Sequence, residues 1–139
     1  LWVDDVVAKS PHRYFDLMVG HSAGYPLILR LLSREDFSAG HIISVAGFIK
    51  PSAYMKNDAT YPDAFDIAHI KSNCHTFTFI HSDNDPWDCD EKQGEFLRQS
   101  LGGTLIIKTG EGHFGSDYLQ QPYKTFPMLL SHCLLEIKD

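Results

Sequence analysis

The sequence predicts an α/β fold in which a mainly parallel sheet is covered by helices on both faces. Four apolar runs have the length of strands, and none alternates strictly between apolar and polar residues: Phe15–Val19, His41–Phe48, Thr76–His81 and Thr104–Thr109. Near-continuous apolar runs of this length are typical of strands buried on both faces, as in a parallel sheet. Helical patterns separate several of the runs, which gives the alternation of strand and helix that α/β folds show.

The first two helices are predicted from apolar spacing and from proline positions. Near the start of the chain four apolar residues share one helical face, and Ser10-Pro11 ends that helix: Trp2, Val3, Val6 and Val7. A second helix covers about Ala23 to Arg34. Pro26 is tolerated there because it lies in the first turn.

Two more helices are predicted in the second half of the chain. One covers about Asp90 to Leu101; Asp88 with Glu91 resembles a capping box, and Gly102-Gly103 supply a stop. The last covers about Tyr123 to Ile137, with a broad apolar face that we expect to be core: Phe126, Leu129, Leu130, Cys133, Leu134 and Ile137.

Residues 49–75 are predicted to form an irregular excursion between two strands, with a short helix near Ala64–Ile70. Long loops at the carboxyl ends of parallel strands often form part of a binding site. A packed surface loop is the alternative interpretation.

Composition narrows the class of protein. The 139 residues suffice for one domain with a buried core. The 12 Lys and Arg against 18 Asp and Glu give a net charge of −6 without a basic run, so we expect no nucleic acid and no membrane as partner. Three cysteines without CxxC spacing favour reduced thiols, and no signal-peptide pattern occurs at Leu1, so we expect a cytoplasmic protein.

Gly20-His21-Ser22-Ala23-Gly24 is the most informative motif. It stands between the predicted strand Phe15–Val19 and the helix that follows. G-x-S-x-G in that position is typical of a nucleophile elbow, in which a sharp turn projects the serine hydroxyl from the sheet edge. The backbone N–H of Ala23 then lies at a helix N-terminus and is a candidate oxyanion donor. The alternative is a serine in an ordinary tight turn.

Two later strands end in residues that a serine nucleophile needs. Ser82-Asp83-Asn84-Asp85-Pro86 follows Thr76–His81, and Gly110-Glu111-Gly112-His113 follows Thr104–Thr109. Because parallel strands share one carboxyl edge, we expect Ser22, an aspartate and His113 to meet there, in the chain order serine, acid, histidine.

One histidine is predicted to be the base of this group, whereas more than one aspartate is a candidate for the acid. His113 is predicted to be the base; the other histidines, among them His21 and His81, are expected to be packing or surface groups. Asp85 and Asp83 compete as the acid, with Asp88 a third candidate. Asp85 is preferred because Pro86 stiffens the residue before it, whereas Asp83 suits a turn cap. The histidine spacing predicts no metal, and we expect no cofactor.

These segments resemble the small serine hydrolases related to retinoblastoma-binding protein nine. The resemblance rests on four stretches: residues 15–24, Ile70-Lys71-Ser72-Asn73-Cys74, Ser82-Asp83-Asn84-Asp85-Pro86-Trp87 and Gly112-His113-Phe114. It implies a small α/β-hydrolase fold, a three-layer sandwich, with Ser22 as nucleophile, Asp85 as acid and His113 as base. Members of that family act on small acyl or ester probes.

One departure from the family pattern concerns the N-terminus. The resemblance implies an early strand and a Gly-rich turn that supplies a second oxyanion donor, but the chain opens in the helix before the elbow strand. We therefore expect residues 1–139 to form a single α/β-hydrolase domain that lacks the N-terminal strands. We further expect this chain alone to be poorly active and marginally stable, or to be part of a longer protein.

The function expected from these observations is hydrolysis of carboxylic esters or related small acyl compounds through a Ser-His-Asp triad and an acyl-enzyme. Four aromatic side chains are candidates for an apolar acyl pocket, with core or surface positions as the alternative: Tyr54, Tyr61, Phe65 and Trp87. Thioesterase or acyltransferase activity uses the same elbow. A non-catalytic module that binds a protein partner on a hydrolase scaffold is the alternative from another class.

Overall fold

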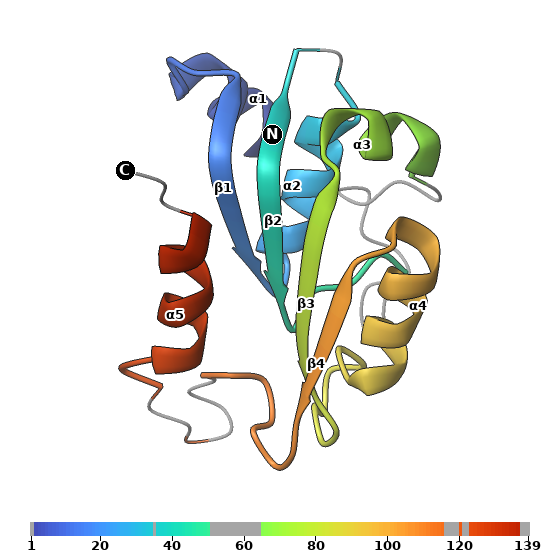
Figure 1. The fold of residues 1–139 in the computed structure, drawn as a ribbon, viewed down its shortest axis with the longest axis vertical. Helices are drawn as coiled ribbons and strands as arrows, with labels where there is room; N and C mark the ends of the chain where they lie inside the picture. Colours follow the sequence, from blue (N-terminus) through green and yellow to red (C-terminus); the bar gives the residue numbers. More distant parts are fainter. Residues whose placement is uncertain (1, 35, 51–64, 116–119, 121–122, 137–139) are drawn as a thin grey trace.

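A parallel sheet forms the centre of the computed structural model, which describes residues 2–34, 36–50, 65–115, 120 and 123–136. Its four strands lie in the order in which the chain makes them: β1 (Tyr14–His21), β2 (Ser38–Val45), β3 (Thr76–Ser82) and β4 (Thr104–Lys108). All three pairings are parallel. In Figure 1 the strands run in one direction and end together at the bottom of the view.

The predicted strands are confirmed, but the second one is shifted at both ends. The second strand begins at Ser38 rather than His41 and ends at Val45 rather than Phe48. Ala46 has a φ of 46°, in the left-handed region, which an extended strand does not contain. The strand therefore stops at Val45, and the chain turns there.

Helices cover both faces of the sheet. The chain forms α1 (Trp2–Lys9), α2 (Gly24–Leu32), α3 (Ile67–Asn73), α4 (Glu91–Leu101) and α5 (Pro127–Glu136). Side chains of α2, α3 and α4 share one core cluster, and α1 contacts α2. Helix α5 packs into the second cluster, next to β1, and stands apart from the other helices in Figure 1. The result is a three-layer arrangement of helix, sheet and helix.

The two clusters divide the apolar residues of each strand between the faces of the sheet. On β2, Ile42 belongs to the first cluster and Ile43 to the second. On β3, Phe79 and Ile80 divide in the same way, and all four side chains are fully buried. This explains the unbroken apolar runs of the sequence, because successive residues of a strand point to opposite faces and both faces are covered.

Helix α4 begins with a cap that differs from the predicted one. The N-cap is Asp90, not Asp88, and its carboxylate accepts hydrogen bonds from the backbone N–H groups of Lys92 (3.0 Å) and Gln93 (3.4 Å). Asp88 has a φ of 59° and belongs to the turn before the helix. The predicted capping box is therefore wrong, although the helix itself is confirmed.

The apolar face predicted for the last helix is also only partly correct. Helix α5 starts at Pro127, later than expected, and its side chains Leu129 and Cys133 pack against the core. Leu130 and Leu134 are 59% and 56% exposed, so they are not core residues. The helix contacts the sheet along a narrower stripe than the predicted face. Ile137 lies outside the described residues.

The short helix of the excursion lies slightly later than predicted. It covers Ile67–Asn73 as α3, and Asp66 caps it by accepting from the N–H of His69 at 3.0 Å. Most of the excursion, residues 51–64, lies outside the described part of the chain. Among the helices that are described, none has the length and apolar content that a membrane crossing requires.

Candidate active site

Ser22 lies at the tip of the turn between β1 and α2, where the sequence predicts an elbow. Its φ is 52°, a left-handed conformation that is uncommon for a residue other than glycine. Gly20 makes the turn sterically feasible, because a Cβ there would lie 2.8 Å from the Cα of Tyr25. A Cβ at Gly24 would meet nothing within 4 Å. The close approach of strand and helix therefore requires the first glycine of the motif and not the second.

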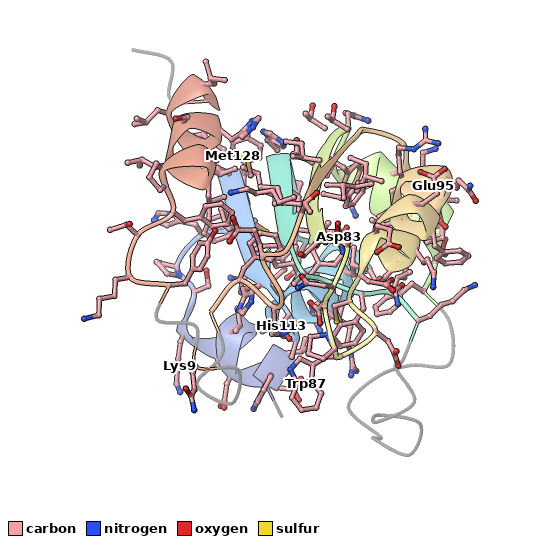
Figure 2. The ribbon with its side chains drawn as sticks, turned by 90° about the horizontal axis from the view of Figure 1, so that it is seen from below. Lys9, Asp83, Trp87, Glu95, His113 and Met128 are labelled. Atoms are coloured by element: carbon pink, nitrogen blue, oxygen red, sulfur yellow. The ribbon has the colours of Figure 1, made fainter. Side chains whose placement is uncertain are left out.

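The strand register brings the three expected residues to one edge. His21 pairs with Val45, Val45 pairs with Ile80, and Ser82 pairs with Lys108, so the strands end close to one level. The loops that follow β1, β3 and β4 carry Ser22, Asp85 and His113. Figure 2 looks onto this edge from below and labels His113 there, among the loops.

The structure brings Ser22, His113 and Asp85 into one hydrogen-bonded line. Nε2 of His113 lies 2.9 Å from Oγ of Ser22, and Nδ1 lies 2.6 Å from Oδ2 of Asp85. Asp85 and His113 are buried, 7% and 8% exposed, so water competes little for these contacts. The backbone N–H of Trp87 donates to the second carboxylate oxygen, Oδ1, at 2.9 Å and holds the carboxylate in place.

This arrangement decides the tautomer of a neutral His113. A carboxylate only accepts hydrogen bonds, so Nδ1 carries the ring proton and donates a hydrogen bond to Asp85. Nε2 is then the unprotonated nitrogen and accepts the hydrogen bond from the Ser22 hydroxyl. The ring is therefore oriented to take up the proton of that hydroxyl.

Asp83, the other acid that the sequence offers, has a different position. Its Oδ1 accepts a hydrogen bond from the backbone N–H of Gly110 at 2.8 Å. That contact joins the loop after β3 to the loop after β4. Asp88 has a φ of 59° in the turn before α4. Asp85 is the acid whose carboxylate lies next to the ring of His113.

The contact of Asp83 is one of a series that sequence reasoning missed. The N–H of Glu111 donates to Oγ of Ser82 (2.9 Å), and the N–H of Gly112 donates to Oδ1 of Asn84 (2.7 Å). The Ser82 hydroxyl donates to the same oxygen of Asn84 at 2.8 Å. We call these contacts of Ser82, Asp83 and Asn84 the loop clamp. The run of small polar residues after the strand was the signal that could have indicated it.

His21 also has a contact that the sequence did not suggest. Its Nε2 donates to the backbone carbonyl of His113 at 2.8 Å, and the two rings lie 5.0 Å apart. The residue before the serine therefore holds the histidine loop from β1. The expectation that His21 is a surface or packing group did not include this hydrogen bond.

The remaining predicted residues are placed differently. Ala23 is the N-cap of α2, so its backbone N–H lies at the N-terminus of that helix, next to Ser22. Trp87 packs against the second core cluster, at the same edge as His113 in Figure 2. Phe65 packs against the first cluster, on the other side of the sheet. Tyr54 and Tyr61 lie outside the described residues.

One group of side chains has the composition of a metal site. A carboxylate oxygen of Asp85, the sulfur of Cys89 and a ring nitrogen of His113 lie within 4.8 Å of one another. Burial, followed by the charges of Asp85, Asp88 and Asp90, raises the pKa of the Cys89 thiol far above its usual value. The thiol is therefore protonated at neutral pH when no cation is bound.

The fold and the site together define the class of this protein. Parallel strands, a strained serine between strand and helix, and Ser, Asp and His in that chain order are features of the α/β-hydrolase fold. The family model described as serine hydrolase matches residues 1–132, and the chain belongs to this family. The relation to retinoblastoma-binding protein nine stays a prediction.

Solved structures agree with this assignment. The ydeN gene product of Bacillus subtilis is 25% identical, with a TM-score of 0.80 over 97% of this chain and 73% of that one. Carboxylesterase CesB (YbfK) of Bacillus subtilis is 13% identical, with a TM-score of 0.61 over 96% of this chain and 63% of that one, and shows the fold alone. A search of curated proteins found no match.

Proposed function

We propose that this chain hydrolyses carboxylic esters or related small acyl compounds through Ser22, His113 and Asp85. The observation that carries the proposal is the unbroken line of hydrogen bonds from Ser22 Oγ through the His113 ring to the Asp85 carboxylate. A serine hydroxyl becomes an effective nucleophile when a base receives its proton in the transition state. Membership in the serine hydrolase family supports the same chemistry.

The proposed reaction has two steps with one proton carrier. Ser22 Oγ attacks the acyl carbon while Nε2 of His113 takes the hydroxyl proton, and Asp85 stabilises the resulting imidazolium. The same nitrogen then gives the proton to the departing alcohol, which leaves an acyl group on Ser22. Water, deprotonated by His113, attacks that ester and releases the acid.

The oxyanion of each tetrahedral intermediate needs hydrogen-bond donors. We assign one of them to the backbone N–H of Ala23, because it follows the nucleophile and lies at the N-terminus of α2. The partial positive charge at that helix end also favours a negative oxygen. Removal of a single oxyanion donor typically lowers kcat by about 10²–10³.

Labelling with a fluorophosphonate, which reacts with activated serines, tests the proposal. Wild type is expected to be labelled at Ser22, and Ser22→Ala to remove the label completely. His113→Ala is expected to slow labelling about 10⁴-fold or more, because the serine loses its base. Turnover of p-nitrophenyl acetate is expected to follow the same order of variants.

Two matched variants control for general damage. Ser33→Ala changes a serine whose hydroxyl donates to Leu29 O at the end of α2, and His12→Ala changes an exposed histidine. Both are expected to be labelled like wild type. A folded wild type that is not labelled, or is labelled equally in Ser22→Ala, would contradict the enzyme and favour a non-catalytic module that binds a protein.

A further inference from the structure

Cys89 brings a third kind of ligand atom to the Asp85–His113 pair. Ligand atoms of the three residues lie within 4.8 Å of one another, and all three residues are buried. Carboxylate oxygen, thiolate sulfur and imidazole nitrogen are the ligands that Zn²⁺ takes in proteins. Hard cations such as Mg²⁺ prefer sets made of oxygen only. The chemistry of this group therefore selects a cation that binds sulfur.

Each member of the group is held by a neighbour outside it. The three holding contacts are the N–H of Trp87 on the Asp85 carboxylate (2.9 Å), the Nδ1 of His81 on the Cys89 carbonyl (2.8 Å) and the Nε2 of His21 on the His113 carbonyl (2.8 Å). The first contact orients a ligand group directly, as outer-shell hydrogen bonds of metal sites do. The other two fix the backbone that carries the thiol and the imidazole. They also keep Cys89 beside the pair, although it comes from the far end of the loop after β3.

The charges around the sulfur favour a cation. Three carboxylates, those of Asp85, Asp88 and Asp90, lie near enough to the Cys89 sulfur to act on it electrostatically. A divalent cation bound to the sulfur is attracted by the same carboxylates and stabilises the thiolate directly.

We propose that Asp85, Cys89 and His113 bind a thiophilic divalent cation such as Zn²⁺, and that the bound cation blocks the site. The binding part does not depend on the proposed hydrolase function, whereas the blocking part rests on it.

Binding at this place changes the tautomer of His113. The Cys89 thiol releases its proton to solvent, and Nδ1 becomes a metal ligand, so the ring proton moves to Nε2. Nε2 can then only donate to Ser22 Oγ and no longer accepts its proton. Asp85, now a ligand, leaves its hydrogen bond with Nδ1. His113 therefore no longer serves as the base, and Asp85 no longer orients its ring.

The required rearrangement is small. Tetrahedral Zn²⁺ at about 2.0–2.3 Å from each ligand atom needs those atoms roughly 3.3–3.6 Å apart. The Asp85–His113 contact of 2.6 Å has to widen, and the sulfur has to move toward the pair from a separation of at most 4.8 Å. Side-chain rotation of Cys89, which now contacts the Trp87 carbonyl at 3.5 Å, supplies most of that movement.

Titration with Co²⁺, a spectroscopic probe for zinc sites, tests the binding part. Wild type is expected to show a thiolate-to-cobalt charge-transfer band and tetrahedral ligand-field bands, which excess Zn²⁺ removes. Cys89→Ala is expected to lose the charge-transfer band. Cys74→Ala, which removes the other fully buried thiol, is expected to keep it. Asp85→Asn, with Cys89 intact, is expected to weaken Co²⁺ binding about 10-fold or more.

A missing charge-transfer band in folded wild type, or an equal band in Cys89→Ala, would overturn the binding part.

Fluorophosphonate labelling of Ser22 tests the blocking part. Zn²⁺ is expected to slow labelling of wild type at least about 10-fold and EDTA to restore it, while Mg²⁺ has no effect. Unchanged labelling at saturating Co²⁺ would overturn it. Absence of labelling without any metal contradicts the proposed function and leaves the cobalt spectrum to decide binding.

Discussion

Ser22 holds its hydroxyl on a backbone conformation that few serines adopt. A non-glycine residue at a φ of 52° stores strain on the order of 1–3 kcal/mol. The packing of β1 against α2 maintains it, since Gly20 lies against the backbone of Tyr25 and Tyr25 is fully buried. At the scale of single residues, the proposed reactivity of the serine rests on the strained turn and on the tautomer of His113 that the hydrogen bonds fix.

The two neighbouring aspartates allow a test at this scale. Asp85→Asn is expected to lower the labelling rate of Ser22 by about 10⁴, because the amide no longer holds the Nδ1–H tautomer. Asp83→Asn keeps an oxygen for the N–H of Gly110 and is expected to stay close to wild type. Rates with p-nitrophenyl acetate provide the second measurement. Equal losses in both variants would contradict the assignment of Asp85 as the acid.

The two loops after β3 and β4 work as one element. Their contacts follow the chain: Gly110, Glu111 and Gly112 donate to the side chains of the loop clamp, and His113 then meets Asp85. The N–H groups of Glu111 and Gly112 are partly buried, and leaving either without its acceptor would cost about 1–3 kcal/mol. The clamp therefore holds the ring of His113 at a fixed distance from the acid, although neither loop has regular secondary structure.

Variants of Asn84 test whether the loop clamp positions His113. Asn84→Ala removes the acceptor of Gly112 N–H and Ser82 Oγ, and is expected to lower kcat about 10- to 100-fold by displacing His113. Asn84→Asp keeps an acceptor oxygen and is expected to recover most of this loss at neutral pH. Stopped-flow labelling and KM for p-nitrophenyl acetate are measured together. Equal rates for the two variants, or a change in KM alone, would argue against a positioning role.

At the scale of the whole molecule, a buried histidine links stability to pH. His81 on β3 is fully buried beneath α4, where a Cβ at Gly94 would come within 2.9 Å of its ring. Its Nδ1 donates to the Cys89 carbonyl. Burial lowers the pKa of His81 below its usual value of 6.5. Below that pH the unfolded chain binds a proton that the folded chain does not, so stability falls as pH falls.

We expect the free energy of unfolding to decrease as pH falls below 6.5, with a contribution from His81 of at most about 1.4 kcal/mol per pH unit. His81→Asn keeps a donor for the Cys89 carbonyl and removes the titration, so its slope in this range is expected to be smaller. The slope is measured by urea denaturation, followed by circular dichroism, between about pH 5 and pH 8, the range in which histidines titrate. A slope that is the same in His81→Asn and wild type would disprove the link, and His12→Asn serves as control.

Most of the fold could be predicted from the sequence, because its signals are local. The four apolar runs correspond to β1 to β4, and proline and glycine positions indicate where the helices begin or end. The cap of α4 and the outward face of α5 could not be predicted in the same way. Asp88 and Asp90 are equivalent as residue types, and only the turn before α4 decides between them. Leu130 and Leu134 have core composition, but no element among the described residues covers them.

The sequence by itself determined that a serine, an aspartate and a histidine follow three strands in hydrolase order, because motif and strand pattern are both written along the chain. The sequence favoured Asp85 over Asp83 without excluding Asp83. Tertiary structure decided between them, because Asp85 meets His113 whereas Asp83 accepts from Gly110. It also decided that Cys89, His21 and the loop clamp belong to the same site. Those contacts join segments far apart in the chain, and their distances follow from strand register and loop packing rather than from local residue preference.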